Sequence, residues 1–424
     1  MDLKTDVVIV GAGGGGAVLG LILARYGIDA VIVDQADGPP HGLRGEILQP
    51  NGQRILDQLG LLEHLPSHAV RPVRRFHFRS PGGRRLCTID YDLLPAPYNR
   101  ALVTWPNVVH QTIVQALEDL RPGWIRYGTS FRRLVKHGES IVGIEAEQHG
   151  RPVRIGAKLV VGADGPCSKV REALGIRTAL HRYREGYLVA MLTCREGLEE
   201  AQYYVGRRTI LGIFPGAGHR VYVLYMIPSD ALPQLRLEGI DNLRKRWIAI
   251  DPAWHRTFAT LEDWGQTAFM GTGRVRAKTW VSDRAALIGD AAHGMNPHAS
   301  QGRMQAMADA VTLADVIRRC AEKEDWSASA LAHYERLRRP QVTMLQRLAD
   351  EEVMFWNTGN PVLAWLRDRV FATIDRNPRL QYQVLSATAG LRQTPPFSWL
   401  DRLQAAGLLP DPRAHSLPTD IPAL

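Results

Sequence analysis

The stretch DVVIVGAGGGGAVLGLILARYGIDAVIVDQ, residues Asp6–Gln35, decides the fold of this chain. Its apolar pattern predicts a strand at Asp6–Val10, a tight glycine turn, a helix from about Ala17 to Tyr26 and a second strand at Ala30–Val33. Units of this kind build parallel sheets with helices on their faces. We therefore expect an α/β fold with a Rossmann-like nucleotide-binding domain.

Glycines at the first turn carry a chemical signal as well as a structural one. Gly11, Gly13 and Gly16 have the GxGxxG spacing between a strand and a helix. The first permits a tight turn, the second lets the backbone approach a pyrophosphate, and the third allows close packing of helix on strand. Asp34 ends the second strand, where an acid accepts hydrogen bonds from ribose hydroxyls. These residues predict dinucleotide binding and leave open whether the ligand is FAD or NAD.

Two later segments repeat the pattern of a buried strand followed by an acid. AKLVVGADGPCSKVRE (157–172) ends its strand at Asp164, and RAALIGDAAHGMNPHASQGRMQAMADAV (284–311) passes from a strand at Ala285–Ile288 into Gly289 and Asp290. Both acids are expected at the carboxyl edge of the sheet, where open α/β sheets bind ligands. For Asp164 the alternative is an Asp-Gly turn that caps a helix. After Pro297 a new helix begins near Gly302, with an apolar face formed by Met307, Ala310, Val311, Ala314 and Ile317.

Taken together, these motifs resemble the group A flavin monooxygenases, the para-hydroxybenzoate hydroxylase family, in order and approximate spacing. The resemblance also covers LRGEILQPNGQRILDQLGLL (43–62), whose Arg44 is similar to the family's arginine near the flavin. HYERLRRPQVTMLQRL (333–348) is similar to the ubiquinone-pathway hydroxylases. It extends over roughly residues 1 to 350. Two departures stand out: Ser300-Gln301-Gly302 replaces the usual Gly-Gln-Gly, and Met304 replaces a frequent asparagine. The family residue that opens the helix in TWPNVVHQTIVQALEDL aligns with either Pro106 or His110, and neither is given a flavin-binding role.

The resemblance implies FAD as the cofactor, with NADPH or NADH as a transient electron donor. In the family the acid of Gly-Asp holds ribityl or ribose hydroxyls, the proline loop runs beside the isoalloxazine ring, and the next helix directs its N-terminus at the pyrimidine edge. The implied FAD-binding residues are Gly11, Gly13, Gly16, Asp34, Arg44, Asp164, Gly289, Asp290, Pro297, Gly302, Arg303 and Met304. No metal is expected.

The activity implied is that of a monooxygenase. It would insert one oxygen atom from O2, by hydroxylation or epoxidation through a flavin hydroperoxide, into a lipophilic aromatic or quinone-like molecule. Two alternatives stay open: a reductase or dehydrogenase on the same fold, and a non-catalytic flavin-binding protein.

The substrate side is predicted from alternating apolar runs within Glu185–Pro228, which indicate antiparallel strands, with further strands between Phe76 and Tyr91. We expect an inserted antiparallel β-sheet domain (73–97 and 181–275) in a discontinuous FAD-binding domain (1–72, 98–180 and 276–325). C-terminal helices and a loose tail (326–424) follow. His298 is a candidate to orient or deprotonate a phenol-like substrate. Candidates to line the substrate pocket are Tyr203, Tyr204, Phe214, Tyr222 and Tyr225.

Composition sets the remaining expectations. The net charge of +9 reflects arginine usage more than a nucleic-acid footprint, although Arg71–Arg85 forms one basic cluster suited to an anionic substrate or nucleotide phosphate. Four widely spaced cysteines fit a reducing cytoplasm. The uncharged run Val7–Ala24 is too glycine-rich for a signal peptide or membrane span. The C-terminal aromatic residues Trp356, Trp365 and Phe371 look exposed in the sequence. They are expected to dock against the main body, to form a dimer face or to make peripheral membrane contact, and the chain is expected to be a monomer or a homodimer.

Overall fold

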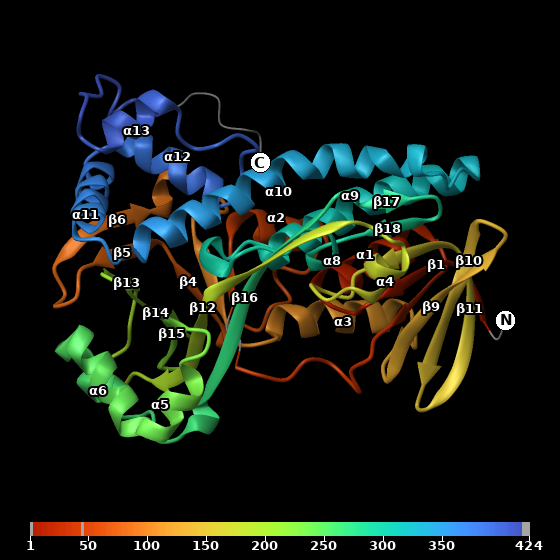
Figure 1. Cartoon of the computed structure of the whole chain (residues 1–424), viewed down its shortest axis with the longest axis horizontal. Coiled ribbons are helices and arrows are strands. Elements are labelled where there is room, and N and C mark those ends of the chain that lie inside the picture. The colour runs from red at the N-terminus through yellow and green to blue at the C-terminus, as the bar shows by residue number, and fades with distance from the viewer. Residues whose placement is uncertain (1–2, 44–45, 418–424) are drawn as a thin grey trace.

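The computed structural model describes residues 3–43 and 46–417, and its main sheet brings the sequence motifs to one edge (Figure 1). The strands are β1 (Leu3–Val10), β2 (Ala30–Val33), β8 (Ile125–Arg126), β9 (Thr129–His137), β10 (Ser140–Gln148), β11 (Arg151–Gly162), β17 (Val281–Ser282) and β18 (Ala285–Leu287). Their order is β17-β18-β11-β1-β2-β8, and β9 and β10 extend the sheet from β11. Val10 pairs with both Val33 and Gly162, and Gly162 pairs with Leu287. The parallel strands therefore end level, each directly before one of the predicted ligand-binding turns.

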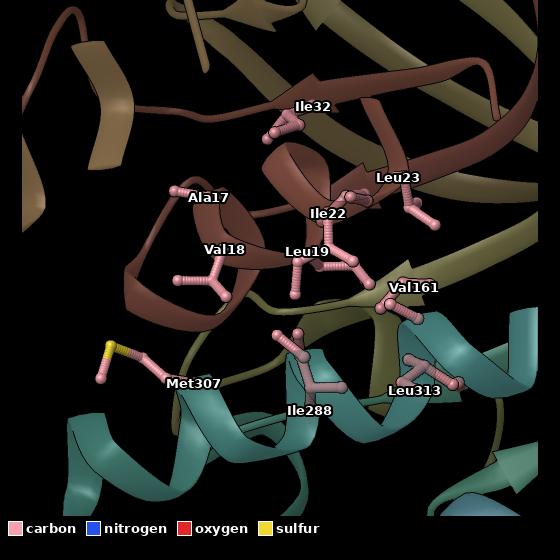
Figure 2. Close-up of a cluster of buried hydrophobic side chains, with 14 of the residues drawn as sticks. Ala17, Val18, Leu19, Ile22, Leu23, Ile32, Val161, Ile288, Met307 and Leu313 are labelled. Atoms are coloured by element: carbon pink, nitrogen blue, oxygen red, sulfur yellow. The ribbon is translucent and has the colours of Figure 1, made fainter. Parts of the chain in front are cut away.

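Helix α1 (Gly14–Tyr26) packs between this sheet and helix α9 (Gly302–Lys323), as Figure 2 shows. The predicted apolar face of α9 is confirmed: Met307, Ala310, Ala314 and Ile317 are fully buried, and Val311 is partly buried. A Cβ atom on Gly15 would lie 3.1 Å from the Ala306 carbonyl oxygen, so the two helices approach closely at this glycine. The N-termini of α1 and α9 are consequently held by one rigid core.

A second sheet stands at the other end of the molecule. Its strands are β5 (Arg75–Arg79), β6 (Arg85–Asp90), β12 (Thr178–Thr193), β13 (Ala201–Gly206), β14 (Thr209–Gly216), β15 (Arg220–Pro228) and β16 (Thr267–Ala277), in the order β16-β12-β15-β14-β13-β5-β6. The predicted antiparallel sheet is confirmed, with one parallel pairing, between β5 and β13. Strands β12 and β16 continue across the predicted domain boundaries at 180/181 and 275/276. The long strands tie the two sheets together, and the domain division itself stays a prediction.

Shorter elements cover these sheets. One face of the second sheet packs on α5 (Leu232–Glu238), α6 (Ile240–Ile250) and α7 (His255–Phe258) around the buried Trp247. A three-stranded sheet, β3-β7-β4, lies between the two larger ones. The remaining elements before the C-terminal region are β3 (Glu46–Leu48), β4 (Val70–Val73), β7 (Ala101–Thr104), α2 (Pro50–Gln58), α3 (Val108–Leu120), α4 (Lys169–Ala173) and α8 (Asp290–His293).

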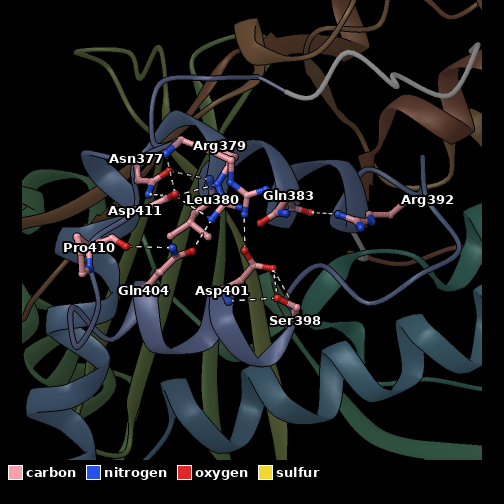
Figure 3. A network of polar contacts seen from close by, with 11 residues as sticks. Asn377, Arg379, Leu380, Gln383, Arg392, Ser398, Asp401, Gln404, Pro410 and Asp411 are labelled. Atoms are coloured by element: carbon pink, nitrogen blue, oxygen red, sulfur yellow. Dashed lines mark hydrogen bonds and ion pairs between the residues drawn. The ribbon is translucent and has the colours of Figure 1, made fainter.

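The C-terminal region is helical, as predicted, but its tail is not loose where it is described. The helices are α10 (Ala328–Trp356), α11 (Pro361–Asp375), α12 (Pro378–Thr388) and α13 (Trp399–Ala405). Arg379, whose side chain is 6% exposed, pairs with Asp401 at 2.7 Å and with Asp411 of the tail at 2.8 Å (Figure 3). A buried arginine needs such partners, so the tail is fixed through Asp411. Sequence periodicity carries no sign of this contact.

The three C-terminal aromatic residues differ in exposure. Trp365 is 60% exposed, Trp356 is partly buried, and Phe371 is only 6% exposed, so Phe371 follows the docking alternative. Phe371 stacks on Phe78 of β5 with a centroid distance of 5.1 Å, so α11 docks on the second sheet through it. Within residues 3–43 and 46–417, no helix has the length and apolar character needed to cross a bilayer.

Candidate active site

The first turn of the nucleotide domain has the geometry that its glycines predict. Gly11 has φ of +106°, and a Cβ atom on Gly16 would lie 2.0 Å from the Gly11 carbonyl oxygen. Around the Cβ position of Gly13, in contrast, no atom of residues 3–43 or 46–417 lies within 4 Å. Within the same part of the chain no side chain caps the N-terminus of α1. Free backbone N–H groups and open space at Gly13 together fit an anionic group such as a pyrophosphate.

Basic side chains from distant segments lie beside this turn. Arg303, in the first turn of α9, forms an ion pair with Glu46, and its side chain comes within 3.2 Å of the Cβ position of Gly14. Its Nη1 is buried and has no hydrogen-bond partner among the described residues. Burial, followed by the charge of Arg303, lowers the pKa of His110 in α3 to about 4, and the His110 Nε2 likewise lacks a partner in the described part of the chain. These are donors suited to phosphate oxygens.

The acids at the strand ends do not all behave alike. Asp34 accepts hydrogen bonds from the backbone N–H of Ala12 at 2.7 Å and of Ala36 at 2.9 Å, so it also holds the glycine turn. Asp290 is exposed and lines the large cleft described below. Asp164 instead accepts from Ser168 Oγ at 2.5 Å and from the backbone N–H of Lys169 at 2.7 Å. These contacts fit the alternative interpretation, an Asp-Gly turn that caps α4 together with Ser168, and the cofactor-binding role of Asp164 stays a prediction.

A buried network of hydrogen bonds, which the sequence analysis did not predict, holds the Gly289–Asp290 turn in place. Asp309 is fully buried and accepts from the Gly289 N–H at 2.9 Å, from His293 Nε2 at 2.5 Å and from Arg338 Nε at 2.9 Å. Burial alone would raise the pKa of Asp309, but His293, Arg338 and the Gly289 N–H outweigh it, so this pKa is lowered. The sequence does carry one signal for this network: Asp309 is an acid between the apolar residues Met307 and Ala310, at a position where a charge needs partners.

The loop before α9 belongs to the same network. Pro297 lies in a short 3-10 turn, Pro297–Ala299, and Gln301 is fully buried and bonds Asn51 of α2, Gln305 and the Thr388 carbonyl oxygen. Among the described residues no side chain caps α9, and the start of this helix at Gly302 lines the cleft. Met304 is 2% exposed and fills the space beside Gly52, which makes its role one of packing. Arg44 lies outside the described residues.

A cleft of about 870 Å³ separates the nucleotide domain from the second sheet. Asp290, Pro297, Gly302, Arg303 and Met304 line one side, and Tyr187, Tyr203, Phe214 and Tyr222 line the other. The structure thus brings together the predicted cofactor and substrate residues from both sides of the fold.

Two of the predicted pocket residues lie on the wrong face of the sheet. Tyr204 donates to Asp251 at 2.8 Å and accepts from Trp254 at 2.6 Å, and Tyr225 packs on Trp247 with a centroid distance of 5.9 Å. Side chains alternate between the two faces along a strand, so Tyr204 points to the face opposite Tyr203, and Tyr225 points to the face opposite Tyr222. Tyr204 and Tyr225 therefore belong to the core beneath α6.

His298 lies where the cleft meets a second cavity, and its Nδ1 is 2.5 Å from the Tyr187 hydroxyl. Burial lowers the pKa of His298 to about 3 and raises that of Tyr187, so both groups are neutral at neutral pH. With the tyrosine donating to Nδ1, the proton of the ring is on Nε2, which is buried without a partner among the described residues. An imidazole this resistant to protonation is suited to orient a substrate as a neutral hydrogen-bond donor, and its role as a general base stays a prediction.

Comparison with known proteins agrees with this geometry. Residues 4–349 match the model of the family described as "FAD binding domain". The chain is 29% identical over 382 residues to a 6-methylpretetramide 4-monooxygenase of Streptomyces rimosus, covering 88% of this chain and 90% of that protein. It is 25% identical to the 3-demethoxyubiquinol 3-hydroxylase of Escherichia coli, with 91% and 99% covered.

Solved structures show the same fold. A p-nitrophenol 4-monooxygenase from Pseudomonas putida superposes with a TM-score of 0.80 at 20% identity, covering 92% of this chain and 100% of that one. The family model spans most of the chain, including all three motifs that meet at the carboxyl edge of the main sheet. This chain belongs to the FAD binding domain family, as a group A flavin monooxygenase.

Proposed function

We propose that this FAD-dependent monooxygenase uses NADPH or NADH and O2 to insert one oxygen atom into a lipophilic aromatic or quinone-like molecule bound beside the cleft. One NAD(P)H, one proton, one O2 and one substrate would give NAD(P)+, water and the oxygenated product. The observation that carries the proposal is the cleft of about 870 Å³, which has Asp290, Arg303 and the start of α9 on one side and an aromatic sheet face on the other. The two curated relatives named above are a monooxygenase and a hydroxylase.

The residues present fit FAD. Gly11, Gly13 and Gly16 would place the N-terminus of α1 against the pyrophosphate, with Arg303 and His110 donating from the side. Asp34 and Asp290 would accept hydrogen bonds from sugar or ribityl hydroxyls. The uncapped N-terminus of α9 at Gly302 and the turn at Pro297 would face the ring system.

Replacing Asp290 by alanine should weaken FAD binding by about 1.5–3 kcal/mol, because the hydroxyl donors lose a charged acceptor. Titration of apoprotein with FAD, followed by quenching of flavin fluorescence, measures this change. Asp230→Ala is the control, since Asp230 is an exposed acid just after β15 on the second sheet and does not line the cleft. An unchanged dissociation constant in Asp290→Ala would remove Asp290 from the site.

When bound, FAD supplies the activation of O2 with electrons from NAD(P)H. The chain supplies orientation and a dry surrounding. Tyr203, Phe214 and Tyr222 present an apolar wall, and the neutral Tyr187–His298 pair presents one N–H donor at Nε2. Such a donor would bind a substrate oxygen without adding a charge to the site. Exclusion of water would keep activated oxygen from being released as hydrogen peroxide before it reaches the substrate.

The reaction type is tested by following NADPH oxidation by the flavin-loaded protein with and without O2. A monooxygenase should consume O2 and NADPH together when substrate is present, and should release less hydrogen peroxide than it does without substrate. Stoichiometric reduction of the substrate without O2 would identify a reductase. No NADPH oxidation under any condition would identify a non-catalytic flavin-binding protein.

A further inference from the structure

A second cavity of about 460 Å³ opens beside the cleft and is roofed by the C-terminal helices. Ile47, Tyr203, His298 and Ser300 line both spaces, so the two are neighbours. Most of its wall is aromatic or aliphatic: Phe76, Phe78 and Tyr91 come from the second sheet and the turn after it, and Trp356 and Phe371 come from α10 and α11. A cavity of this size and lining suits a flat, multi-ring ligand.

A buried carboxyl interrupts the apolar wall. Glu352 of α10 is 8% exposed and lines this cavity, and no hydrogen bond contributes to its electrostatics among the described residues. Two other polar groups of the wall have protein partners: Glu351 pairs with Arg402 at 2.9 Å at the rim, and Tyr91 donates to Gln49 at 2.9 Å. The Glu352 carboxyl is open to the cavity and has no protein partner among the described residues, so a hydroxyl group of a ligand bound there would satisfy it.

We propose that Glu352 determines substrate specificity by binding a phenolic or enolic hydroxyl of an uncharged, multi-ring aromatic substrate held in this cavity. The inference rests on the proposed function and names the substrate class of the same site. The hydroxyl would donate to the carboxyl of Glu352 while the rings pack against Trp356, Phe78 and their neighbours.

The charge state of the wall supports an uncharged ligand. Burial, with a smaller contribution from Glu351, raises the pKa of Glu352 to about 8, so the carboxyl is mostly protonated at neutral pH. A protonated carboxyl can both donate to and accept from a neutral hydroxyl. An aromatic carboxylate would be desolvated beside an acid, and Arg402, the cation on the described wall, is already paired with Glu351. Benzoate-like anions should therefore bind poorly.

Equilibrium dialysis of the flavin-loaded protein against 2-naphthol, naphthalene and 2-naphthoate tests this proposal. The wild type should bind 2-naphthol at least about tenfold more tightly than either analogue, since naphthalene leaves the carboxyl unpaired and 2-naphthoate brings in a buried charge. Glu352→Leu should bind 2-naphthol and naphthalene about equally tightly. Glu352→Gln should keep most of it, because the amide oxygen still accepts a hydrogen bond.

Glu322→Gln is the control, the same substitution at an exposed acid of α9 that does not line the cavity, and it should leave the preference for 2-naphthol over naphthalene unchanged. A wild-type preference that survives in Glu352→Leu, equal binding of 2-naphthoate, or no binding of 2-naphthol would each overturn the inference. Flavin content and NADPH oxidation measured on the same samples keep the two questions apart. A wild type that binds no flavin or does not oxidise NADPH would count against the proposed function. A wild type that does both, with the same preference for 2-naphthol over naphthalene in Glu352→Leu, would count against Glu352 alone.

Discussion

Gly13→Val should purify as a folded protein that has lost FAD. The backbone at Gly13 has φ of −65°, which valine adopts readily, and no atom lies within 4 Å of its Cβ position. The added side chain therefore fits the protein but occupies the space where the pyrophosphate would approach. We expect the FAD dissociation constant to rise by at least about 100-fold, or about 2.8 kcal/mol, with the thermal unfolding midpoint of the apoprotein nearly unchanged.

Gly16→Val separates this ligand effect from a folding effect. Its Cβ atom would lie 2.0 Å from the Gly11 carbonyl oxygen, so this variant should lose both stability and flavin. If Gly13→Val instead retained FAD at full stoichiometry, the cofactor would have to bind elsewhere and the assignment of the first turn would be wrong.

Asp309→Ala should destabilise the protein by about 3–5 kcal/mol, because it leaves the buried Arg338 guanidinium without its carboxylate. It also frees the Gly289 N–H, so the turn that carries Asp290 should lose its fixed position and FAD binding should weaken with it. Chemical denaturation measures the first effect and flavin titration the second. Since the pKa of Asp309 is lowered in the folded protein, its stabilising contribution is present at neutral pH and is lost as the pH falls through that lowered value.

Asp315→Ala is the control on the same helix. Asp315 accepts a hydrogen bond from Tyr26 at the surface, and its loss should cost less than about 1 kcal/mol. Equal destabilisation by the two substitutions would show that the buried network has no special weight.

The nucleotide side of the fold was predictable because its signals are local. Strand β2 and the start of α9 fall at the predicted residues, since an apolar run and a glycine turn determine each of them within a few positions. Asp164 shows the limit of such reasoning. Its motif is compatible with a ligand or a helix cap, and only the structure shows the contacts with Ser168 and Lys169 that fit the cap.

The substrate side was less predictable because it depends on contacts between distant segments. Tyr203 and Tyr204 are adjacent and equally aromatic, and strand alternation allows only one of them to face the cleft. Which one does so is fixed by the pairing of β13 with β14 and β5. Glu352 lies in a long polar helix and becomes a site candidate only when α10 packs over the second sheet.

The most direct test of the whole account is the origin of the oxygen atom in the product. Flavin-loaded protein should be given NADPH, oxygen-labelled O2 and a panel of uncharged multi-ring phenols, and the products analysed by mass spectrometry. A monooxygenase should give a product that carries one labelled oxygen atom, with the second labelled atom in water. One product molecule should form for each NADPH that is not spent on hydrogen peroxide. A product whose added oxygen comes from unlabelled solvent, or a reduced substrate without label, would contradict it.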